Sequence, residues 1–222
     1  MKGTPELIVM LTHNDYTVSN AVEVFESCKD APISMWGFKE AGLARDDMLY
    51  LAGRITECGK IPVLEVVAYD EDECIRGAEV AAECGCGILM GTVYYDAVNS
   101  FCTEHDIKYL PFVGKVEGRP SVLSGEIYEI ASEAKAILER GIYGIDLLGY
   151  RYTGNSAELN GNLIDQLPCP VCIAGGVDSY DKLDEIKAAN PWAFTVGSAF
   201  FQNKFGDNFK NQIYTVLEYI KK

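Results

Sequence analysis

Three ionisable residues interrupt otherwise apolar segments of this chain. Lys39 follows the segment MWGF, Glu65 lies within PVLEVVA, and Asp146 lies within GIDLLGYRY. An ionised side chain is costly to bury without a partner, so such residues indicate either a paired internal network or chemistry. A carboxylate can move a proton next to a substrate carbonyl, and an ammonium group can stabilise the oxyanion that develops there. The set predicts an isomerase, an epimerase or a lyase, with Glu65 or Asp146 as base and acid and Lys39 polarising the carbonyl.

Lysine also supports a second chemistry. A neutral amine attacks a carbonyl carbon to form a Schiff base when burial or a neighbouring cation lowers its pKa. Lys39, or less favourably Lys115, would be the nucleophile of such an aldolase. Lys39 is equally compatible with a solvated surface position, because it follows an apolar segment and precedes a glycine loop. The two mechanisms and the structural interpretation stay open at the level of sequence.

Further polar residues stand where they could bind a substrate. His13, Asn14 and Asp15 follow the first apolar segment, ELIVML. Arg151 lies between two tyrosines after the segment that holds Asp146. A guanidinium group at that position could clamp a carboxylate or phosphate with two hydrogen bonds, or stack on the neighbouring rings.

The segment GKVEGRPSVLSG is the longest connection between the predicted elements. It contains Lys115 and Arg119 among three glycines, a proline and two serines. Long loops at an active site can close over the substrate and exclude water. We expect either a lid that brings two cations to an anionic ligand or an ordinary exposed loop.

The elements that must position these residues repeat along the chain. Amphipathic helical patterns end at a glycine in ITECGK, AAECGC and ILERGI, and an apolar run follows each one. Eight such runs begin near Leu7, Ile33, Ile61, Gly87, Ile107, Ile142, Pro170 and Trp192. Strands that are apolar on both faces are typical of a parallel sheet covered by helices. Eight units predict a closed (β/α)8 TIM barrel in one domain over residues 1–222, with a final helix near 207–222, rather than an open sheet of five or six strands.

Two glycine turns follow the seventh and eighth predicted strands. Gly175 and Gly176 stand in AGGV before Val177, and Gly197 and Ser198 stand in VGSA. Glycine permits positive φ and close approach, so backbone amides at such turns can point at an oxyanion. A helical turn that opens after each glycine adds unpaired N–H groups. Because the two strands are neighbours in a barrel, we expect the amides of 175–177 and 197–198 to share one phosphate.

This pair of turns resembles the phosphate-binding TIM barrels, the group that contains phosphoribosyl isomerases, indole-glycerol-phosphate synthases and ribulose-phosphate epimerases. The resemblance covers about the last quarter of the chain. It implies a small phosphorylated metabolite as the ligand, but not a particular reaction, since the same cradle holds flavin mononucleotide in some barrels. A barrel that binds such a metabolite without catalysis and regulates another process fits the same turns.

The chain departs from these families at several strand ends. Zinc-dependent epimerases use two histidines and two carboxylates there, and only His13 qualifies in this chain, so we expect no metal and no other cofactor. Phosphoribosyl isomerases place an acidic residue after the fifth strand, where this chain has Gly114 and Lys115. Lysine-dependent keto-acid and deoxyribose-phosphate aldolases take their lysine from the sixth strand, where this chain has Asp146.

Composition narrows the partners. The formal net charge of -14 opposes binding to nucleic acid or to an acidic membrane surface. No apolar run reaches the roughly 18 residues of a membrane span, and ELIVML is too short for a secretory signal, so we expect a cytoplasmic protein, either monomeric or homo-oligomeric.

The eight cysteines are expected to be reduced thiols packed as small core residues. Cys169 and Cys172 form a CxxC, and Cys84 and Cys86 flank a glycine, so a metal or redox site is the alternative. Several predicted strands separate the two pairs, so four convergent ligands are hard to assemble.

Overall fold

The computed structural model describes residues 3–222. Within that range, eight parallel strands form one sheet in the order β10-β11-β12-β1-β4-β5-β6-β7. In chain order these strands are β1 (Glu6–Met10), β4 (Met35–Lys39), β5 (Ile61–Val66), β6 (Ile88–Gly91), β7 (Lys108–Leu110), β10 (Ile145–Leu147), β11 (Val171–Ile173) and β12 (Ala193–Val196). The two ends of the sheet meet through hydrogen bonds from Gly144 N to Tyr109 O (3.3 Å) and from Asp146 N to Pro111 O (3.0 Å). The predicted eight-stranded barrel is confirmed.

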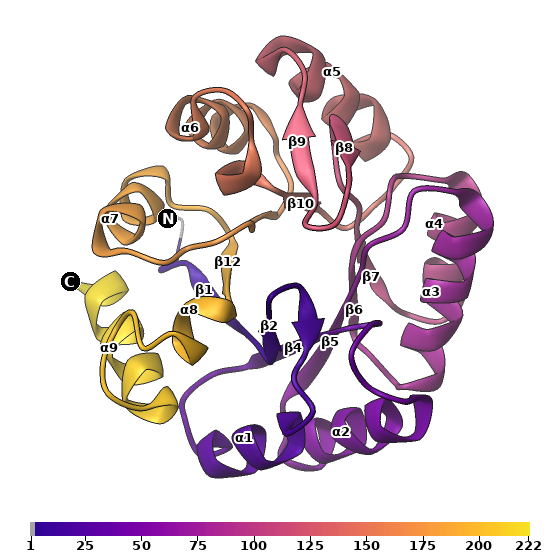
Figure 1. Cartoon of the computed structure of the whole chain (residues 1–222). Coiled ribbons are helices and arrows are strands. Elements are labelled where there is room, and N and C mark those ends of the chain that lie inside the picture. The colour runs from indigo at the N-terminus through magenta and orange to yellow at the C-terminus, as the bar shows by residue number, and fades with distance from the viewer. Residues whose placement is uncertain (1–2) are drawn as a thin grey trace.

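Helices surround the ring of strands (Figure 1). In the described range they are α1 (Ala21–Cys28), α2 (Arg45–Glu57), α3 (Glu71–Glu83), α4 (Asp96–Glu104), α5 (Ile127–Leu138), α6 (Ser156–Gln166), α7 (Tyr180–Ala189), α8 (Ser198–Phe201), α9 (Phe209–Lys221) and the 3-10 helix η1 (Gly149–Arg151). The glycine stops predicted after three helices are confirmed, because Gly59, Gly85 and Gly141 have φ of 71°, 63° and 85°. Among residues 3–222, none of the helices combines the length and the apolar character that crossing a bilayer requires.

The core has two layers, one on each face of the barrel sheet. The inner layer fills the barrel with Ile8, Met10, Met35, Val63, Ile88, Met90, Leu110, Cys172 and Ala193. The outer layer packs the alternate side chains of each strand, such as Trp36 and Phe38 of β4, against the helices. Gly37 leaves room in the inner layer for the side chain of Met10, whose Sδ a Cβ at position 37 would overlap. The inner layer is mainly apolar through the middle of the barrel, where Asp146 beside Cys172 is an exception, and other polar side chains enter it near the carboxyl ends of the strands.

Two antiparallel hairpins stand on the carboxyl side of the barrel. The first follows β1 and pairs β2 (Thr12–His13) with β3 (Tyr16–Thr17). The second follows β7 and pairs β8 (Lys115–Glu117) with β9 (Val122–Ser124). This second hairpin occupies the segment in which sequence predicted a long loop. It forms because Val116 and Leu123 bury their side chains, whereas the residues that alternate with them, such as Lys115, Glu117 and Val122, point to solvent.

Candidate active site

Lys39 and Glu65 lie side by side at the carboxyl end of the barrel. The strands β4 and β5 pair in a register that sets Lys39 opposite Glu65. Side chains alternate between the faces of a strand, so Lys39 shares the inner face of β4 with Met35. Lys39 Nζ is 3.1 Å from Glu65 Oε1, and the two residues are only 4% and 8% exposed. Two of the three ionisable residues singled out from the sequence thus form a buried ion pair.

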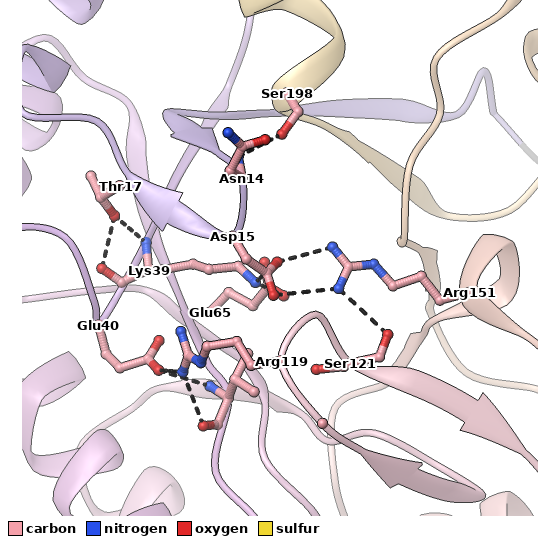
Figure 2. Close-up of polar contacts among 12 residues, drawn as sticks. Asn14, Asp15, Thr17, Lys39, Glu40, Glu65, Arg119, Ser121, Arg151 and Ser198 are labelled. Carbon is pink, nitrogen blue, oxygen red and sulfur yellow. Dashed lines mark hydrogen bonds and ion pairs between the residues drawn. The ribbon is translucent and has the colours of Figure 1, made fainter.

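Asp15 joins this pair from the β2–β3 hairpin. Asn14 and Asp15 form its two-residue turn with φ of 49° and 70°. A tight hairpin turn of this kind requires left-handed backbone, which Asn and Asp tolerate better than most residues. Asp15 Oδ1 accepts hydrogen bonds from Lys39 Nζ at 2.8 Å and from Arg151 Nη2 at 2.9 Å. Figure 2 shows the carboxylate between the two cations.

Thr17 fixes the backbone of Lys39, a role that the sequence did not reveal. Its hydroxyl accepts a hydrogen bond from Lys39 N at 2.8 Å and donates one to Lys39 O at 2.9 Å. Thr17 N also donates to Ala41 O at 2.9 Å. The hairpin that carries Asp15 is therefore fastened directly to the strand that carries Lys39.

The charges in this network set the ionisation of its members. Burial raises the pKa of Asp15, but hydrogen bonds and positive charge from Arg151 and Lys39 outweigh it and bring the pKa down to about 2. Burial lowers the pKa of Lys39, but the negative charges of Glu65 and Asp15 outweigh it and hold the pKa above its ordinary value. At neutral pH Lys39 is an ammonium ion. In that state it can stabilise an oxyanion, whereas attack on a carbonyl requires loss of a proton.

Asp146 lies inside the barrel and away from the cavity wall. Its side chain is fully buried, and within residues 3–222 neither carboxyl oxygen has a hydrogen-bond partner. Burial, followed by the charge of nearby Glu65, raises the pKa of Asp146 well above its ordinary value. Burial therefore favours the protonated, neutral form of this carboxyl group. The structure does not bring Asp146 to the cavity that Lys39 and Glu65 share.

A cavity of about 200 Å³ connects the ion network to the two glycine turns. Its lining includes Asp15, Lys39, Glu65 and Arg151 together with Gly175, Gly176, Val177, Gly197 and Ser198. The turns after β11 and β12 therefore face the same space, as their positions in a barrel predicted.

The backbone amides of these turns are not used in backbone hydrogen bonds within the described part of the chain. Within residues 3–222, the N–H groups of Gly175, Gly176, Val177, Gly197 and Ser198 have no backbone acceptor. Gly175 and Gly176 have φ of 104° and 117°. A Cβ at Gly176 would meet no described atom within 4 Å, whereas one at Gly175 would approach Arg151 Cγ at 2.8 Å. The backbone at Gly176 is therefore open, and the turn packs closely on the residue that binds Asp15.

His13 and Asn14 lie outside the cavity. The ring of His13 packs against the ring of Phe201, with centroids 5.9 Å apart. Asn14 is exposed, and its N–H donates to Ser198 Oγ at 3.1 Å (Figure 2). Asn14 therefore ties the hairpin to the turn after β12, and neither residue lines the substrate space.

The β8–β9 hairpin does not bring its cations to the cavity. Arg119 forms an ion pair with Glu40 and donates a hydrogen bond to Val67 O at 3.3 Å (Figure 2). The Lys115 side chain is 70% exposed and lies 3.3 Å from Glu117. Arg119 thus fastens the hairpin beside the site, while Lys115 is a surface residue.

Several cavity residues were missed by sequence reasoning. Thr12, Asp178, Thr195 and Gln202 also line the space. Thr195 could have been predicted from the sequence, because it is the polar residue of the apolar strand AFTV and lies two positions before Gly197. Asp178 precedes Ser179, the N-cap of α7, and its Oδ1 accepts a hydrogen bond from Lys182 Nζ at 2.8 Å.

Metal-binding side chains do not gather in the described part of the chain. Among residues 3–222 there is no group of three or more His, Cys, Asp or Glu side chains that could hold an ion. All eight cysteines are free thiols in the structure.

Known proteins resemble this chain in fold. No protein-family model and no curated protein matches the chain. Solved structures do match: tryptophan synthase from M. tuberculosis has a TM-score of 0.71 at 15% identity, with 100% of this chain and 94% of that chain covered. The native KDPGal structure also has a TM-score of 0.71, at 14% identity, with coverage of 100% and 97%. The chain has a TIM-barrel fold.

A third TIM barrel of similar length shows the same relationship. Orotidine 5'-phosphate decarboxylase from Pyrococcus horikoshii OT3 has a TM-score of 0.69 at 14% identity, with 97% of this chain and 99% of that chain covered. TIM barrels of one architecture host many unrelated reactions. The similarity therefore establishes the fold, and the chemistry of this chain is argued from its own residues.

Proposed function

We propose that this TIM barrel is an enzyme that moves a proton next to the carbonyl group of a small phosphorylated sugar or keto-acid. The reaction class is that of an isomerase, an epimerase or a lyase with an enediolate or enolate intermediate. One observation supports this proposal most: a single cavity is lined by the Lys39–Glu65 ion pair and by two turns with free backbone amides.

Glu65 and Lys39 divide the chemistry between them. The Glu65 carboxylate takes a proton from the carbon next to the substrate carbonyl, and the electron pair of that C–H bond moves into the enolate. The Lys39 ammonium, which lies 3.1 Å from Glu65 Oε1, stabilises the negative oxygen. Glu65 then returns the proton to the same or the adjacent carbon. Asp146 takes no direct part, because it does not line the cavity.

The glycine turns supply the binding energy for the phosphate. The chain has a formal net charge of -14, so an anion needs a local set of donors. Backbone N–H groups at 175–177 and 197–198 provide such donors without side chains that would hold the anion at a distance. The cavity of about 200 Å³ is smaller than the roughly 300–1,000 Å³ of sites for drug-sized ligands. That volume favours a phosphate ester of a few carbons over flavin mononucleotide.

A Schiff-base aldolase is the second candidate, because Lys39 is a buried lysine on the cavity wall. Its ammonium state opposes this mechanism. Nucleophilic attack requires a neutral amine and therefore a low pKa, whereas the carboxylates of Glu65 and Asp15 raise the pKa of Lys39. Lys115 is exposed and outside the cavity, which removes the support for it as the nucleophile.

Solvent deuterium exchange tests the proposal. Ligands are first selected by thermal shift among phosphorylated sugars and keto-acids, since a ligand at 100 times its Kd stabilises the fold by about 2.7 kcal/mol. Each stabilising ligand is then incubated with the enzyme in D2O and observed by proton NMR. We expect deuterium at the carbon next to the carbonyl, loss of exchange in Glu65→Gln, and unchanged exchange in Lys115→Met.

Two other outcomes would contradict the proposal. Ligands that stabilise the protein but never exchange a proton would indicate a regulatory barrel without catalysis. Borohydride trapping of a keto-acid on Lys39, found by peptide mass spectrometry, would indicate the aldolase.

A further inference from the structure

Asp15 contacts both cations of the cavity wall. Its Oδ1 is 2.8 Å from Lys39 Nζ and 2.9 Å from Arg151 Nη2, and its Oδ2 is 3.4 Å from Arg151 Nη1. A carboxylate offers about four acceptor sites, and protein donors approach three of them. The sequence suggested that Asp15 binds substrate. Its contacts fit a different role, in which Asp15 positions Lys39 and Arg151.

The local backbone holds Asp15 in an unusual conformation. Two consecutive residues without glycine's freedom, Asn14 and Asp15, have left-handed φ. The two-residue hairpin turn requires this conformation, which Asn and Asp adopt more readily than most residues. Thr17 binds the backbone of Lys39 on one side of the turn, and Asn14 N binds Ser198 Oγ on the other. The hairpin is thereby tied down at two points, with the Asp15 carboxylate directed at Lys39.

We propose that Asp15 is a positioning residue that fixes Lys39 as an ammonium ion beside Glu65 and so commits the cavity to enolate stabilisation instead of Schiff-base formation. The role of Lys39 in catalysis rests on the proposed function. The ionisation of Lys39 does not, because it is measured without substrate.

Charged groups face Lys39 from four elements. Asp15 comes from the β2–β3 hairpin, Glu65 from β5, Asp146 from β10 and Arg151 from η1. Asp15 and Glu65, at 2.8 and 3.1 Å from Lys39 Nζ, supply the negative charge that compensates the burial of Lys39. Arg119, from the β8–β9 hairpin, acts on Asp15 from a greater distance. Without the Asp15 charge, only the Glu65 carboxylate would raise the pKa of Lys39, while burial and the positive charge of Arg151 would lower it.

The expected consequence is a more nucleophilic Lys39. An opposite charge within hydrogen-bonding distance changes a pKa by about 1–3 units. Asp15→Asn keeps the shape of the side chain and removes its charge. We therefore expect the fraction of neutral amine at Lys39 to rise about tenfold or more at any pH below its pKa.

Carbamylation by cyanate measures that fraction. The neutral amine nitrogen attacks the carbon of isocyanic acid, a nitrogen–carbon bond forms, and the amine proton moves to the cyanate nitrogen to give a neutral urea. Peptide mass spectrometry gives the rate at Lys39 divided by the rate at exposed Lys115 in the same sample, so the cyanate concentration cancels. Asp15→Glu is the matched control, because it perturbs the packing of the same turn and keeps the negative charge.

We expect a low ratio in the wild-type protein, an increase of about tenfold or more in Asp15→Asn, and no such increase in Asp15→Glu. An unchanged ratio in Asp15→Asn would overturn the proposal. An equal increase in Asp15→Glu would also overturn it, because access and not charge would then control Lys39. If Asp15→Asn does not fold, as judged by circular dichroism, the wild-type ratio decides: Lys39 modified as fast as Lys115 contradicts the proposal. Absence of deuterium exchange would refute the proposed function, but it would not change the carbamylation ratio, which is measured without substrate.

Discussion

Two walls of one cavity are built in opposite ways. The charged wall consists of Asp15, Lys39, Glu65 and Arg151, and each of these ions has an oppositely charged protein partner. The glycine wall consists of residues 175–177 and 197–198, whose N–H groups find no backbone acceptor among the described residues. Full charges must be compensated before they can be buried, whereas backbone dipoles at the edge of a cavity can be left to solvent or ligand.

The difference assigns separate tasks to the walls. A network that is already paired keeps its groups in place and needs no rearrangement when charge develops in a transition state. In the proposed function, the amides of the glycine wall exchange hydrogen bonds to solvent for hydrogen bonds to the phosphate. Changes to the charged wall should therefore alter kcat and stability, and changes to the glycine wall should alter KM.

Lys39→Met should have the largest effect. It removes the oxyanion donor and leaves Asp15 and Glu65 as neighbouring buried carboxylates. We expect kcat for exchange to fall by about 10³-fold and the free energy of unfolding to fall by about 3–5 kcal/mol at neutral pH. Deuterium exchange and urea unfolding measure the two effects. A variant with wild-type kcat would show that Lys39 is a structural ion only.

The two buried aspartates should respond to pH in opposite directions. The folded-state pKa of Asp15 is about 2, below its ordinary 3.8, so its contribution of about 2 kcal/mol is present above pH 4 and is lost as the pH falls towards 2. The pKa of Asp146 is raised, so stability is lost as the pH rises above 4, where the unfolded chain releases the proton first. Asp15→Asn should thus be less stable than wild type at neutral pH, and Asp146→Asn more stable.

Urea unfolding of both variants between pH 2 and 7 checks these signs. The gap between wild type and Asp15→Asn should close towards pH 2, and the gap for Asp146→Asn should close towards pH 3. If the two variants showed the same dependence of stability on pH, the distinction between the ion-paired Asp15 and the unpaired Asp146 would be wrong.

Gly176→Ala should separate binding from chemistry. Its φ of 117° is unfavourable for alanine, and the added methyl group would occupy open space in the cavity lining. We expect KM for the phosphorylated substrate to rise about tenfold, with kcat nearly unchanged. Gly161→Ala, in α6 and with no atom within 4 Å of the added Cβ, is the matched control and should leave KM unaltered. A loss confined to kcat would contradict the division between the walls.

Lys115→Met should have the smallest effect. The ion pair of Lys115 with Glu117 is on the surface, where such pairs contribute about 0–1 kcal/mol. Kinetic constants within about twofold of wild type are expected. A large loss of activity would restore Lys115 as a candidate for catalysis.

Much of the fold could be predicted because the signals are local. Apolar strands, amphipathic helices and glycine stops such as Gly59 and Gly85 each occupy a few consecutive residues, and eight repeats favour a closed barrel. Lys39 and Glu65 could be found for the same reason, since ions stand out in apolar runs. The β8–β9 hairpin was missed although Val116 alternates with two charged residues, because glycines and a proline suggested a loop.

The rest of the site depends on contacts between distant residues. Thr17 binds Lys39 across 22 positions, and Asp15 meets Arg151 across 136. No spacing in the sequence encodes these pairs. How deep a side chain lies in the barrel also depends on the tertiary structure. The pattern of a single strand therefore could not show that Glu65 lines the cavity and Asp146 does not.

A titration of inorganic phosphate followed through backbone amide NMR shifts tests the central claim most directly. The account predicts saturable shifts centred on residues 175–177 and 197–198, with loss of these shifts in Gly176→Ala and their retention in Gly161→Ala. Shifts confined to surface cations such as Lys115, with the two glycine turns unaffected, would contradict it.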